Sequence, residues 1–320
     1  MVKASTPAQP NAIVVCCTPN WLPLAGATLL SCVQNGGAEV ADFYVLTSNS
    51  SEMDRHHFAS FTKAHGFAPT LMDVSLPKEL AAFPTARFST AALLRLALDQ
   101  HLPVHYNRVL YLDCDILCEN SVTEIFKIDL HGKSLGAVED YQSLPGPLNM
   151  FGSHVRKIGL PSGARYFNSG VLLFDWKQTL SRKILSRCVR HITKLQMSGE
   201  SYNLPDQDVL NLEFAGDWQP LNIKFNLMAF FVDYFAIAPV FRHFSNKYKP
   251  WNGTWLPGLT KYRARYEALL TDSPWPDFVA KRFSKIAFVE ASACALRRID
   301  FISRKRFTKH LRHAENPSVE

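Results

Sequence analysis

An α/β fold with a mixed, mostly parallel sheet sandwiched by helices is predicted by two observations on this sequence. Short runs rich in β-branched and aromatic residues alternate with segments of helical periodicity, as in a series of strand–helix–strand units. The predicted strands are also apolar at successive positions. Strands of a parallel sheet carry such continuous runs because helices cover both faces. A chain of 320 residues, 47% of them apolar, can bury the large core that this fold needs.

The predicted elements follow one another in a regular order. Strands are expected over 12–17, 42–48, 68–75 and 108–113, and helices over 22–35, 52–66 and 89–102. Gly36 and Gly37 end the first helix, because glycine readily adopts the left-handed backbone that closes a helix. Further elements are a strand over 165–176, a loop into a helix over 204–215, and a strand into a loop over 239–251. The proline-broken residues 271–277 mark the boundary between a main domain (11–270) and an extension (271–320).

The extension is basic and is expected to be helical. From Asp277 to the end there are ten lysine and arginine residues and five acidic ones, so this segment carries +5 of the formal net charge of +7. Its cations are interleaved with aromatic and aliphatic residues. This pattern predicts either a helix packed on the domain or peripheral contact with an anionic membrane. Nucleic acid is not expected as a partner, because no recognition module or platform of stacking aromatics is present.

The rest of the composition indicates a cytoplasmic location, with the extension as a means of attachment to the inner face of the cytoplasmic membrane. No stretch of about 18 uncharged apolar residues occurs, so no membrane-spanning helix is predicted. The first residues, MVKASTPAQPNAIVV, do not have the pattern of a secretory signal. The seven cysteines, an odd number found mostly in apolar segments, are expected to be reduced thiols.

Two carboxylates, Asp113 and Asp115, stand one residue apart at the end of the fourth predicted strand. In an extended chain both point to the same face, with Cα atoms about 6.5 Å apart. Two like charges at that distance repel unless a cation lies between them or one carboxylate takes up a proton. Open α/β sheets hold ligands at the carboxyl ends of parallel strands, and hard divalent cations prefer oxygen ligands. The pair therefore predicts a site for Mn²⁺ or Mg²⁺.

Two other interpretations fit the pair less well. The aspartates are not needed to cap the next helix, because Ser121 and Glu124 are spaced to form a capping box. Phosphatases of the haloacid-dehalogenase type also end a strand in Asp-x-Asp, but they usually carry threonine or valine where this chain has Leu117. The segment GDWQPL (216–221) also lacks the second acid of their later motif.

His243 ends another apolar run and is followed by a loop that holds Lys249. An imidazole with two carboxylates forms a nitrogen and oxygen ligand set suited to Mn²⁺ or Mg²⁺, with substrate oxygens at the remaining positions. Taken singly, a histidine after a strand also fits a surface or core position. Lys249 is expected to neutralise a departing phosphate, and Pro250 and Trp251 to stiffen its loop.

Several polar residues elsewhere have two interpretations each. Arg95 lies in the apolar helical run AALLRLAL and either pairs with Asp99 one turn on or binds an anion. Asp206 follows a proline and is either a helix N-cap or a functional carboxylate. Asn168 is either a loop residue that ties down backbone or a ligand. Gln207 has no comparable structural explanation.

These residues fall in blocks that together resemble glycosyltransferase family 8, the retaining transferases that include bacterial lipopolysaccharide galactosyl- and glucosyltransferases and glycogenin. The blocks are LLRLAL, VLYLDCDIL, YFNSGVLLFDW with LPDQDVLN, and HFSNKYKPW, in the expected order within residues 12–252. The resemblance implies a GT-A nucleotide-sugar domain. It also implies transfer of a hexose, glucose or galactose, from a UDP-sugar to a glycan or glycolipid acceptor such as lipopolysaccharide core.

The resemblance assigns roles on the donor side of the site. Asp113, Asp115 and His243 would hold the metal ion, and Lys249 would contact the donor diphosphate. The cation and Lys249 would then offset the charge that builds on the leaving nucleoside diphosphate.

The resemblance also assigns a sugar pocket to Arg95, Asp140 and Asn168, with Asp206 and Gln207 beside the anomeric carbon. Gln207 carries an uncharged amide and is a poor nucleophile. Attack by the acceptor on the same face, with the departing phosphate as base, is therefore favoured, and Asp206 as a covalent nucleophile is the alternative.

Some positions depart from the family pattern. Thr18 and Pro19 stand where many members carry an acidic residue near the nucleotide base, whereas Asn20 matches. Thr18 and Asn20 are predicted to line the nucleotide site. Asn246 replaces a glycine of the loop after His243, and asparagine tolerates left-handed backbone better than most residues. The altered first loop also suits a catalytically silent protein that binds nucleotide sugars or serves as a scaffold.

Overall fold

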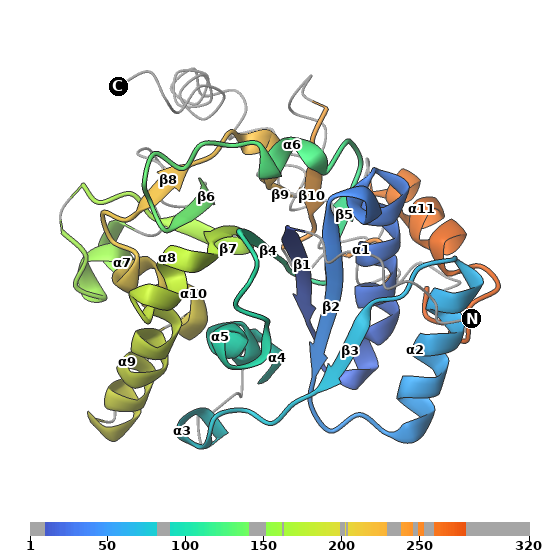
Figure 1. Ribbon diagram of the computed structural model, residues 1–320, viewed down its shortest axis with the longest axis horizontal. Coiled ribbons are helices and arrows are strands. Elements are labelled where there is room, and N and C mark those ends of the chain that lie inside the picture. Colours follow the sequence, from blue (N-terminus) through green and yellow to red (C-terminus); the bar gives the residue numbers. More distant parts are fainter. Residues whose placement is uncertain are drawn as a thin grey trace, which may run out of the picture.

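The computed structural model of the chain describes residues 10–81, 90–140, 152–161, 163–198, 202, 204–228, 238–245, 249–252 and 259–279. Their main feature is a seven-stranded sheet (Figure 1). Its strands are β1 (Asn11–Cys16), β2 (Ala41–Thr47), β3 (Thr70–Asp73), β4 (Arg108–Leu112), β6 (Leu135–Glu139), β7 (Phe167–Asp175) and β8 (Trp218–Pro220). Their order is β3-β2-β1-β4-β7-β6-β8, and β7 runs antiparallel to both neighbours while the others share one direction. The predicted mixed, mostly parallel sheet is confirmed.

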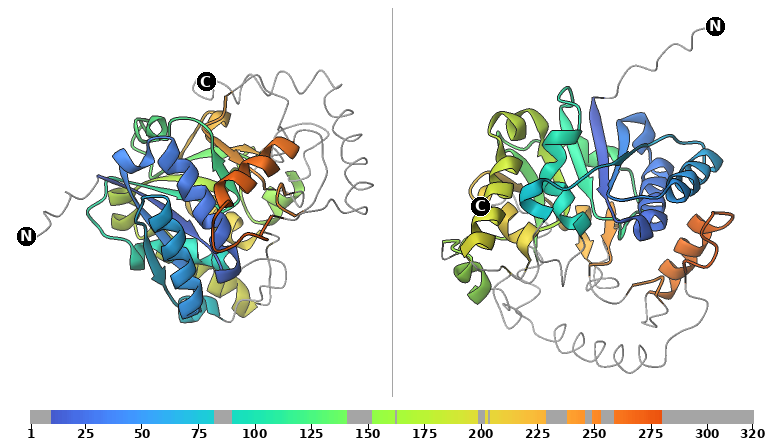
Figure 2. Two further views of the ribbon diagram at one scale, coloured as in Figure 1. Left: turned by 90° about the vertical axis from the view of Figure 1, so that its right-hand side faces the viewer. Right: turned by 90° about the horizontal axis from the view of Figure 1, so that it is seen from below.

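Helices cover both faces of this sheet (Figures 1 and 2). One group contains α1 (Leu22–Gln34), α2 (Glu52–Ala64) and α11 (Thr260–Leu270). The other contains α4 (Thr90–Leu94), α5 (Leu98–His101), α8 (Trp176–Ser181), α9 (Ile184–Ser198) and α10 (Pro205–Glu213). Successive residues of β1 divide between two clusters of buried side chains. Ile13 and Val15 belong to the cluster that includes α1, and Val14 and Cys16 belong to the one that includes α4, α9 and α10. Both faces of the strand are thus buried, which explains its continuous apolar run.

A smaller sheet lies beyond the end of β4. It consists of β5 (Ile116–Cys118), β9 (Leu227–Met228) and β10 (Phe241–His243), in the order β5-β10-β9. β10 is antiparallel to β5 and parallel to β9. Three further α-helices are short, namely α3 (Lys78–Ala81), α6 (Thr123–Phe126) and α7 (Gly152–Lys157).

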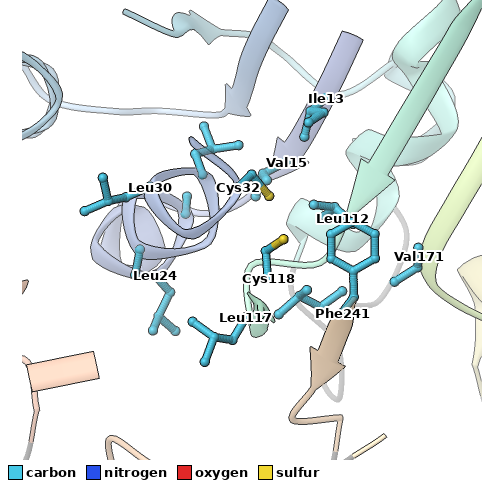
Figure 3. Close-up of a cluster of buried hydrophobic side chains, with 14 of the residues drawn as sticks. Ile13, Val15, Leu24, Leu30, Cys32, Leu112, Leu117, Cys118, Val171 and Phe241 are labelled. Carbon is cyan, nitrogen blue, oxygen red and sulfur yellow. The ribbon is translucent and has the colours of Figure 1, made fainter. Parts of the chain in front are cut away.

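One part of the core joins these two sheets to α1, as Figure 3 shows. Leu112 of β4, Val171 of β7 and Phe241 of β10 are fully buried there, beside Leu24 and Leu30 of α1. Full burial of each such side chain contributes about 1.5–3 kcal/mol. Leu112 is the last residue of β4, Val171 directly follows Gly170, and Phe241 lies two residues before His243. The core therefore holds the backbone next to the residues of the site.

Two local predictions differ from the structure. The predicted helix over 89–102 is interrupted at Arg95–Ala97, where a 3₁₀ turn separates α4 from α5. The capping box is also wrong, because α6 is a single turn that begins after Val122 and has no side-chain cap. The Ser121 hydroxyl pairs with Thr123, and the Glu124 carboxylate accepts a hydrogen bond from Lys224 at 2.6 Å. Glu124 is thus engaged by a charge distant in sequence rather than by its own helix start.

The beginning of the predicted extension packs on the domain. The ring of Trp275 lies 5.5 Å from that of Phe61 in α2, and Val279 is buried in the same core. The basic residues from 281 onward lie outside the described residues, so the helical character and the membrane contact expected of them stay predictions. Within the described part of the chain, no helix is both long and apolar enough to cross a membrane.

Candidate active site

The two aspartates lie where β4 ends, next to the end of β1. β1 and β4 are parallel neighbours with Val15 opposite Leu112, so the loops after both strands leave the sheet at the same edge. The chain does not stay extended through Asp113 and Asp115, as the sequence suggested, but turns there before β5. The carboxylates still converge, because the turn places both toward His243.

His243 meets the aspartates because β10 pairs with β5. Its backbone lies opposite Ile116, the residue after Asp115. The imidazole Nε2 is 3.2 Å from Asp115 Oδ1 and 3.7 Å from Asp113 Oδ2. One ligand atom from each of the three side chains lies within 4.8 Å of the others. The tertiary structure thus brings together the three residues that the sequence predicted as a metal site.

Backbone hydrogen bonds fix the segments that carry these side chains. The N–H of Asp113 donates to Gly170 O of β7 at 2.8 Å, and the N–H of Phe244 donates to Asp115 O at 3.0 Å. From α1, the buried hydroxyl of Thr28 lies 3.0 Å from Cys114 O and 2.8 Å from Ile116 O. The turn is therefore held from the sheet, from the helix and from β10.

Charged partners orient the carboxylates. Asp113 Oδ1 accepts hydrogen bonds from Arg95 at 2.8 Å and from the Tyr111 hydroxyl at 2.6 Å. Asp115 Oδ2 accepts one from Lys249 at 2.6 Å. Burial acts to raise the pKa of Asp115, but the adjacent Lys249 and His243 lower it more, so this pKa lies well below its ordinary value. Asp115 is therefore a carboxylate at neutral pH.

The donor set fits a divalent cation. Asp115 Oδ1 is buried, and no described residue gives it a hydrogen bond of good geometry, although His243 Nε2 lies 3.2 Å away. A buried carboxylate oxygen without a hydrogen bond destabilises the folded protein, unless a positive charge lies next to it. Two carboxylates with one imidazole nitrogen suit Mn²⁺ or Mg²⁺ with further oxygen ligands from a substrate. These residues could hold such an ion.

A second cluster consists of buried amides and one carboxylate. Gln207 Oε1 accepts from the N–H of Ser169 at 3.0 Å, and Gln207 Nε2 donates to Asp140 Oδ2 at 3.2 Å. Asn168 Nδ2 also donates to Asp140 Oδ2, at 3.2 Å. Asn168 and Asp140, assigned by the resemblance to the sugar pocket, thus lie together with Gln207, assigned to the anomeric carbon.

For Arg95 and Asp206, the purely structural interpretation from the sequence is wrong in each case, and the functional one stays a prediction. Arg95 does not pair with Asp99, whose carboxylate accepts from Ser186 instead. Its guanidinium is buried against Asp113, with Nε 3.4 Å from Asp206 Oδ2. Asp206 is not the N-cap, because α10 begins after Leu204. Arg95 therefore links the residues assigned to the metal and to the anomeric carbon.

The residues assigned to the nucleotide lie in the loop after β1. The Thr18 hydroxyl donates to Asn20 Oδ1 at 2.5 Å, and Asn20 is exposed. The next residue, Trp21, packs edge-on against Trp251 with ring centroids 6.3 Å apart. Lys249 Nζ lies 5.9 Å from the Trp251 ring. The loop after β1 therefore contacts the segment that carries Lys249. Asn246 lies outside the described residues.

The sequence did not indicate that Tyr111, Gly170 and Asn226 belong to the site. Tyr111 occupies an ordinary strand position, and its contact with Asp113 appears only in the fold. Gly170 lies so close to His243 that an added Cβ would be 2.2 Å from Cε1 of the ring. Asn226 is fully buried, and its Oδ1 lies 3.0 Å from His243 Nδ1. In the sequence, Asn226 is marked only as a polar residue between apolar ones, Phe225 and Leu227.

Known proteins resemble this chain in sequence and in structure. The model of glycosyl transferase family 8 matches residues 12–254. The lipopolysaccharide 1,2-glucosyltransferase of Escherichia coli (strain K12) is 24% identical over 270 residues, which cover 81% of this chain and 77% of that protein. The lipopolysaccharide 1,3-galactosyltransferase of Salmonella typhimurium is 24% identical over 270 residues, or 80% of this chain and 76% of that protein.

A crystal structure of galactosyltransferase LgtC in complex with donor and acceptor sugar analogs is similar with a TM-score of 0.68 and 25% identity. The similarity covers 84% of this chain and 99% of that one. The α/β architecture described above thus matches the GT-A fold of LgtC. The family match spans most of the chain, including both clusters of polar residues. The chain therefore belongs to glycosyltransferase family 8, as a hexosyltransferase with the GT-A fold.

Proposed function

We propose that this protein is a metal-dependent, retaining hexosyltransferase that moves glucose or galactose from a UDP-sugar to a glycan or glycolipid acceptor such as lipopolysaccharide core. The observation that carries the proposal is the convergence of Asp113, Asp115 and His243. The sugars and the acceptor class follow the names of the relatives, which include lipopolysaccharide glucosyl- and galactosyltransferases.

The donor side of the site would bind the diphosphate. Asp113, Asp115 and His243 would hold Mn²⁺ or Mg²⁺, which supplies Lewis-acid stabilisation of the leaving diphosphate when bound. Lys249 already lies beside Asp115, so its ammonium is positioned to contact the same phosphate oxygens. Thr18 and Asn20 would line the nucleoside end, in the loop that packs through Trp21 on Trp251.

The sugar would lie against the buried amide cluster. Asp140 and Asn168, which form a hydrogen bond with each other, would line the pocket for the sugar hydroxyls, and Arg95 lies 3.4 Å from Asp206. Gln207 Oε1 already lies within hydrogen-bond distance of the Ser169 N–H and hydroxyl and of Asn168 Nδ2. An amide oxygen that is occupied in this way is a poor nucleophile. This arrangement supports same-face attack, with the departing phosphate accepting the proton of the acceptor hydroxyl.

A screen of nucleotide sugars tests this function. The purified protein is expected to release nucleoside diphosphate from one UDP-hexose when Mn²⁺ is present, because the cation stabilises the leaving group. EDTA should abolish the release, and added Mn²⁺ should restore it. Product is measured by coupled detection of UDP, with each nucleotide sugar tested alone and with acceptor glycans. Full release in excess EDTA would remove the metal from the proposed function.

The same screen separates the enzyme from a catalytically silent nucleotide-sugar-binding or scaffold protein, the alternative suggested by Thr18 and Pro19. A silent protein would bind UDP-sugars in calorimetry but release no UDP under any condition. The retained Asp113, Asp115, Gln207 and His243 favour the enzyme. The family match leaves the haloacid-dehalogenase alternative without support.

We also propose that the basic segment 281–312 attaches the protein to anionic membranes. Each lysine or arginine near such a surface contributes about 1 kcal/mol. Full-length protein in which Arg304, Lys305 and Arg306 are replaced by glutamine is therefore expected to bind vesicles of anionic lipid more weakly in flotation assays. Vesicles of neutral lipid are the control. Equal flotation of both proteins would contradict a membrane role for this segment.

A further inference from the structure

The orientation of His243 is fixed by a chain of hydrogen bonds that begins at a backbone N–H. The N–H of Gly170 donates to Asn168 Oδ1 at 3.0 Å. A backbone nitrogen can only donate, so the atom of Asn168 that faces it must be the oxygen. This settles which way the Asn168 amide points, a choice that the shape of the side chain leaves open.

The orientation of the Asn168 amide in turn fixes that of the Asn226 amide. Asn226 Nδ2 donates to the same Asn168 Oδ1 at 2.8 Å. Because that oxygen is an acceptor, the atom of Asn226 that contacts it must be its nitrogen. The other end of the Asn226 amide is then the oxygen, and this oxygen lies 3.0 Å from His243 Nδ1.

The last step of the chain places a proton on the imidazole. Asn226 Oδ1 has no hydrogen to give, so His243 Nδ1 must carry the proton of their hydrogen bond. The other ring nitrogen, Nε2, faces Asp115 Oδ1 and Asp113 Oδ2. In neutral imidazole, Nδ1–H leaves the lone pair on Nε2, the form in which histidine binds a metal ion.

Burial makes this arrangement rigid. Asn226 is fully buried and His243 is 3% exposed, so water does not compete for the hydrogen bond between them. Gly170 faces the Cε1 atom of the ring so closely that an added Cβ would lie 2.2 Å from it, which leaves the imidazole little room to rotate.

We propose that Asn226 is a positioning residue that keeps the proton of His243 on Nδ1 and thereby presents Nε2 to a divalent cation. The inference rests on the proposed function, because it assumes that His243 is a metal ligand. Hydrogen-bond partners of ligating histidines typically change metal affinity by 10–100-fold. Asn226 acts through His243 and does not itself contact the ion.

Two substitutions separate this role from packing. Asn226→Leu has similar volume but no acceptor, and its dissociation constant for Mn²⁺ is expected to be about 10–100-fold higher, as followed by electron paramagnetic resonance. Asn226→Asp keeps an acceptor for Nδ1–H, although it replaces the donation to Asn168 by a contact between two oxygens and adds a negative charge. It should still hold the proton on Nδ1 and therefore bind Mn²⁺ more tightly than Asn226→Leu does. Asn211→Leu is the matched control. Asn211 is also buried but bonds to backbone groups of Phe167 and Gln207.

Nitrogen NMR of protein labelled in histidine tests the proton position directly. The signal of His243 is assigned by its loss in His243→Ala. Its Nδ1 is expected to carry a proton both without and with Mg²⁺, and addition of Mg²⁺ should change Nε2. An unprotonated Nδ1 in the unchanged protein would overturn the proposal.

The outcomes also distinguish this inference from the proposed function. If the unchanged protein binds Mn²⁺ and Asn226→Leu binds it equally well, the positioning role is wrong while the metal site stands. If the unchanged protein does not bind Mn²⁺, the metal site is wrong. The nitrogen signals of the metal-free protein then still report whether Asn226 holds the proton on Nδ1. If Asn226→Leu does not fold, the nitrogen signals of the unchanged protein still test whether Nδ1 of His243 carries the proton.

Discussion

Asp115→Asn is expected to lower the rate of sugar transfer by about a hundredfold to a thousandfold. The substitution keeps the shape of the side chain but removes the charge that lies between Lys249 and His243. Lewis-acid stabilisation by a metal contributes several kcal/mol, and each 1.4 kcal/mol corresponds to about a tenfold change in rate. Initial rates of UDP release at saturating donor measure the effect, and Mn²⁺ titration should show weaker binding. Asp113→Asn should behave similarly.

Asp217→Asn is the matched control for these variants. Asp217 is also a carboxylate with a charged partner, Arg182, but this pair is partly exposed and lies outside both polar clusters. Pairs of that kind contribute about 1 kcal/mol or less to stability. The control should therefore keep its activity. Wild-type activity in a folded Asp115→Asn variant would show that the doublet does not hold the catalytic cation.

Gly170→Ala is expected to displace His243 and to weaken Mn²⁺ binding by at least about tenfold, with a matching loss of transfer. The added Cβ would lie 2.2 Å from Cε1 and 2.6 Å from Nδ1 of the ring, far inside van der Waals contact. The imidazole cannot simply move away, because Asn226 holds Nδ1 and the two aspartates surround Nε2. Binding of Mn²⁺, UDP release and the thermal unfolding midpoint are measured together.

Gly136→Ala provides the control, because it makes the same chemical change at a buried glycine of the neighbouring strand β6. There the added Cβ would lie 2.7 Å from Leu130 Cδ2 and 3.1 Å from Leu221 Cδ2, which are ends of flexible side chains. This variant should lose some stability but keep its affinity for Mn²⁺. Equal Mn²⁺ affinities for the two variants would contradict the expectation that Gly170 leaves the space in which the His243 ring lies.

Much of the fold was accessible from local sequence patterns. The predicted bounds of β1, β2, β4, α1 and α2 agree with the structure within a few residues. Burial leaves either a continuous apolar run or a helical periodicity along the chain, and both can be seen in the sequence. The predicted secondary structure was wrong where side chains bind to residues that are distant in sequence. The run around Arg95 is helical by pattern, yet it contains a 3₁₀ turn where the guanidinium reaches Asp113 and Ser169.

The residues of the site, like the elements of the fold, could be predicted only in part from the sequence. Asp113, Asp115 and His243 could be named from the sequence, because like charges after a buried strand and an imidazole after another are unusual enough to suggest one ligand. The roles of Tyr111, Gly170 and Asn226 could not. A tyrosine in a strand, a glycine before an apolar run and a single asparagine are common in sequences of every class, and nothing near them in the chain marks their partners.

Local patterns in the chain were thus enough to predict the first strands and helices, the family and the chemical types of the side chains at the candidate metal site, but not α9, α11 or β6. The tertiary structure decided which charge pairs with Arg95, how the turn between β4 and β5 brings the carboxylates together, and which nitrogen of His243 faces them. Local patterns report burial and periodicity, because these depend on residues a few positions apart. Hydrogen-bond partners and close packing depend on segments such as β7, β9 and β10, which meet only when the chain is folded.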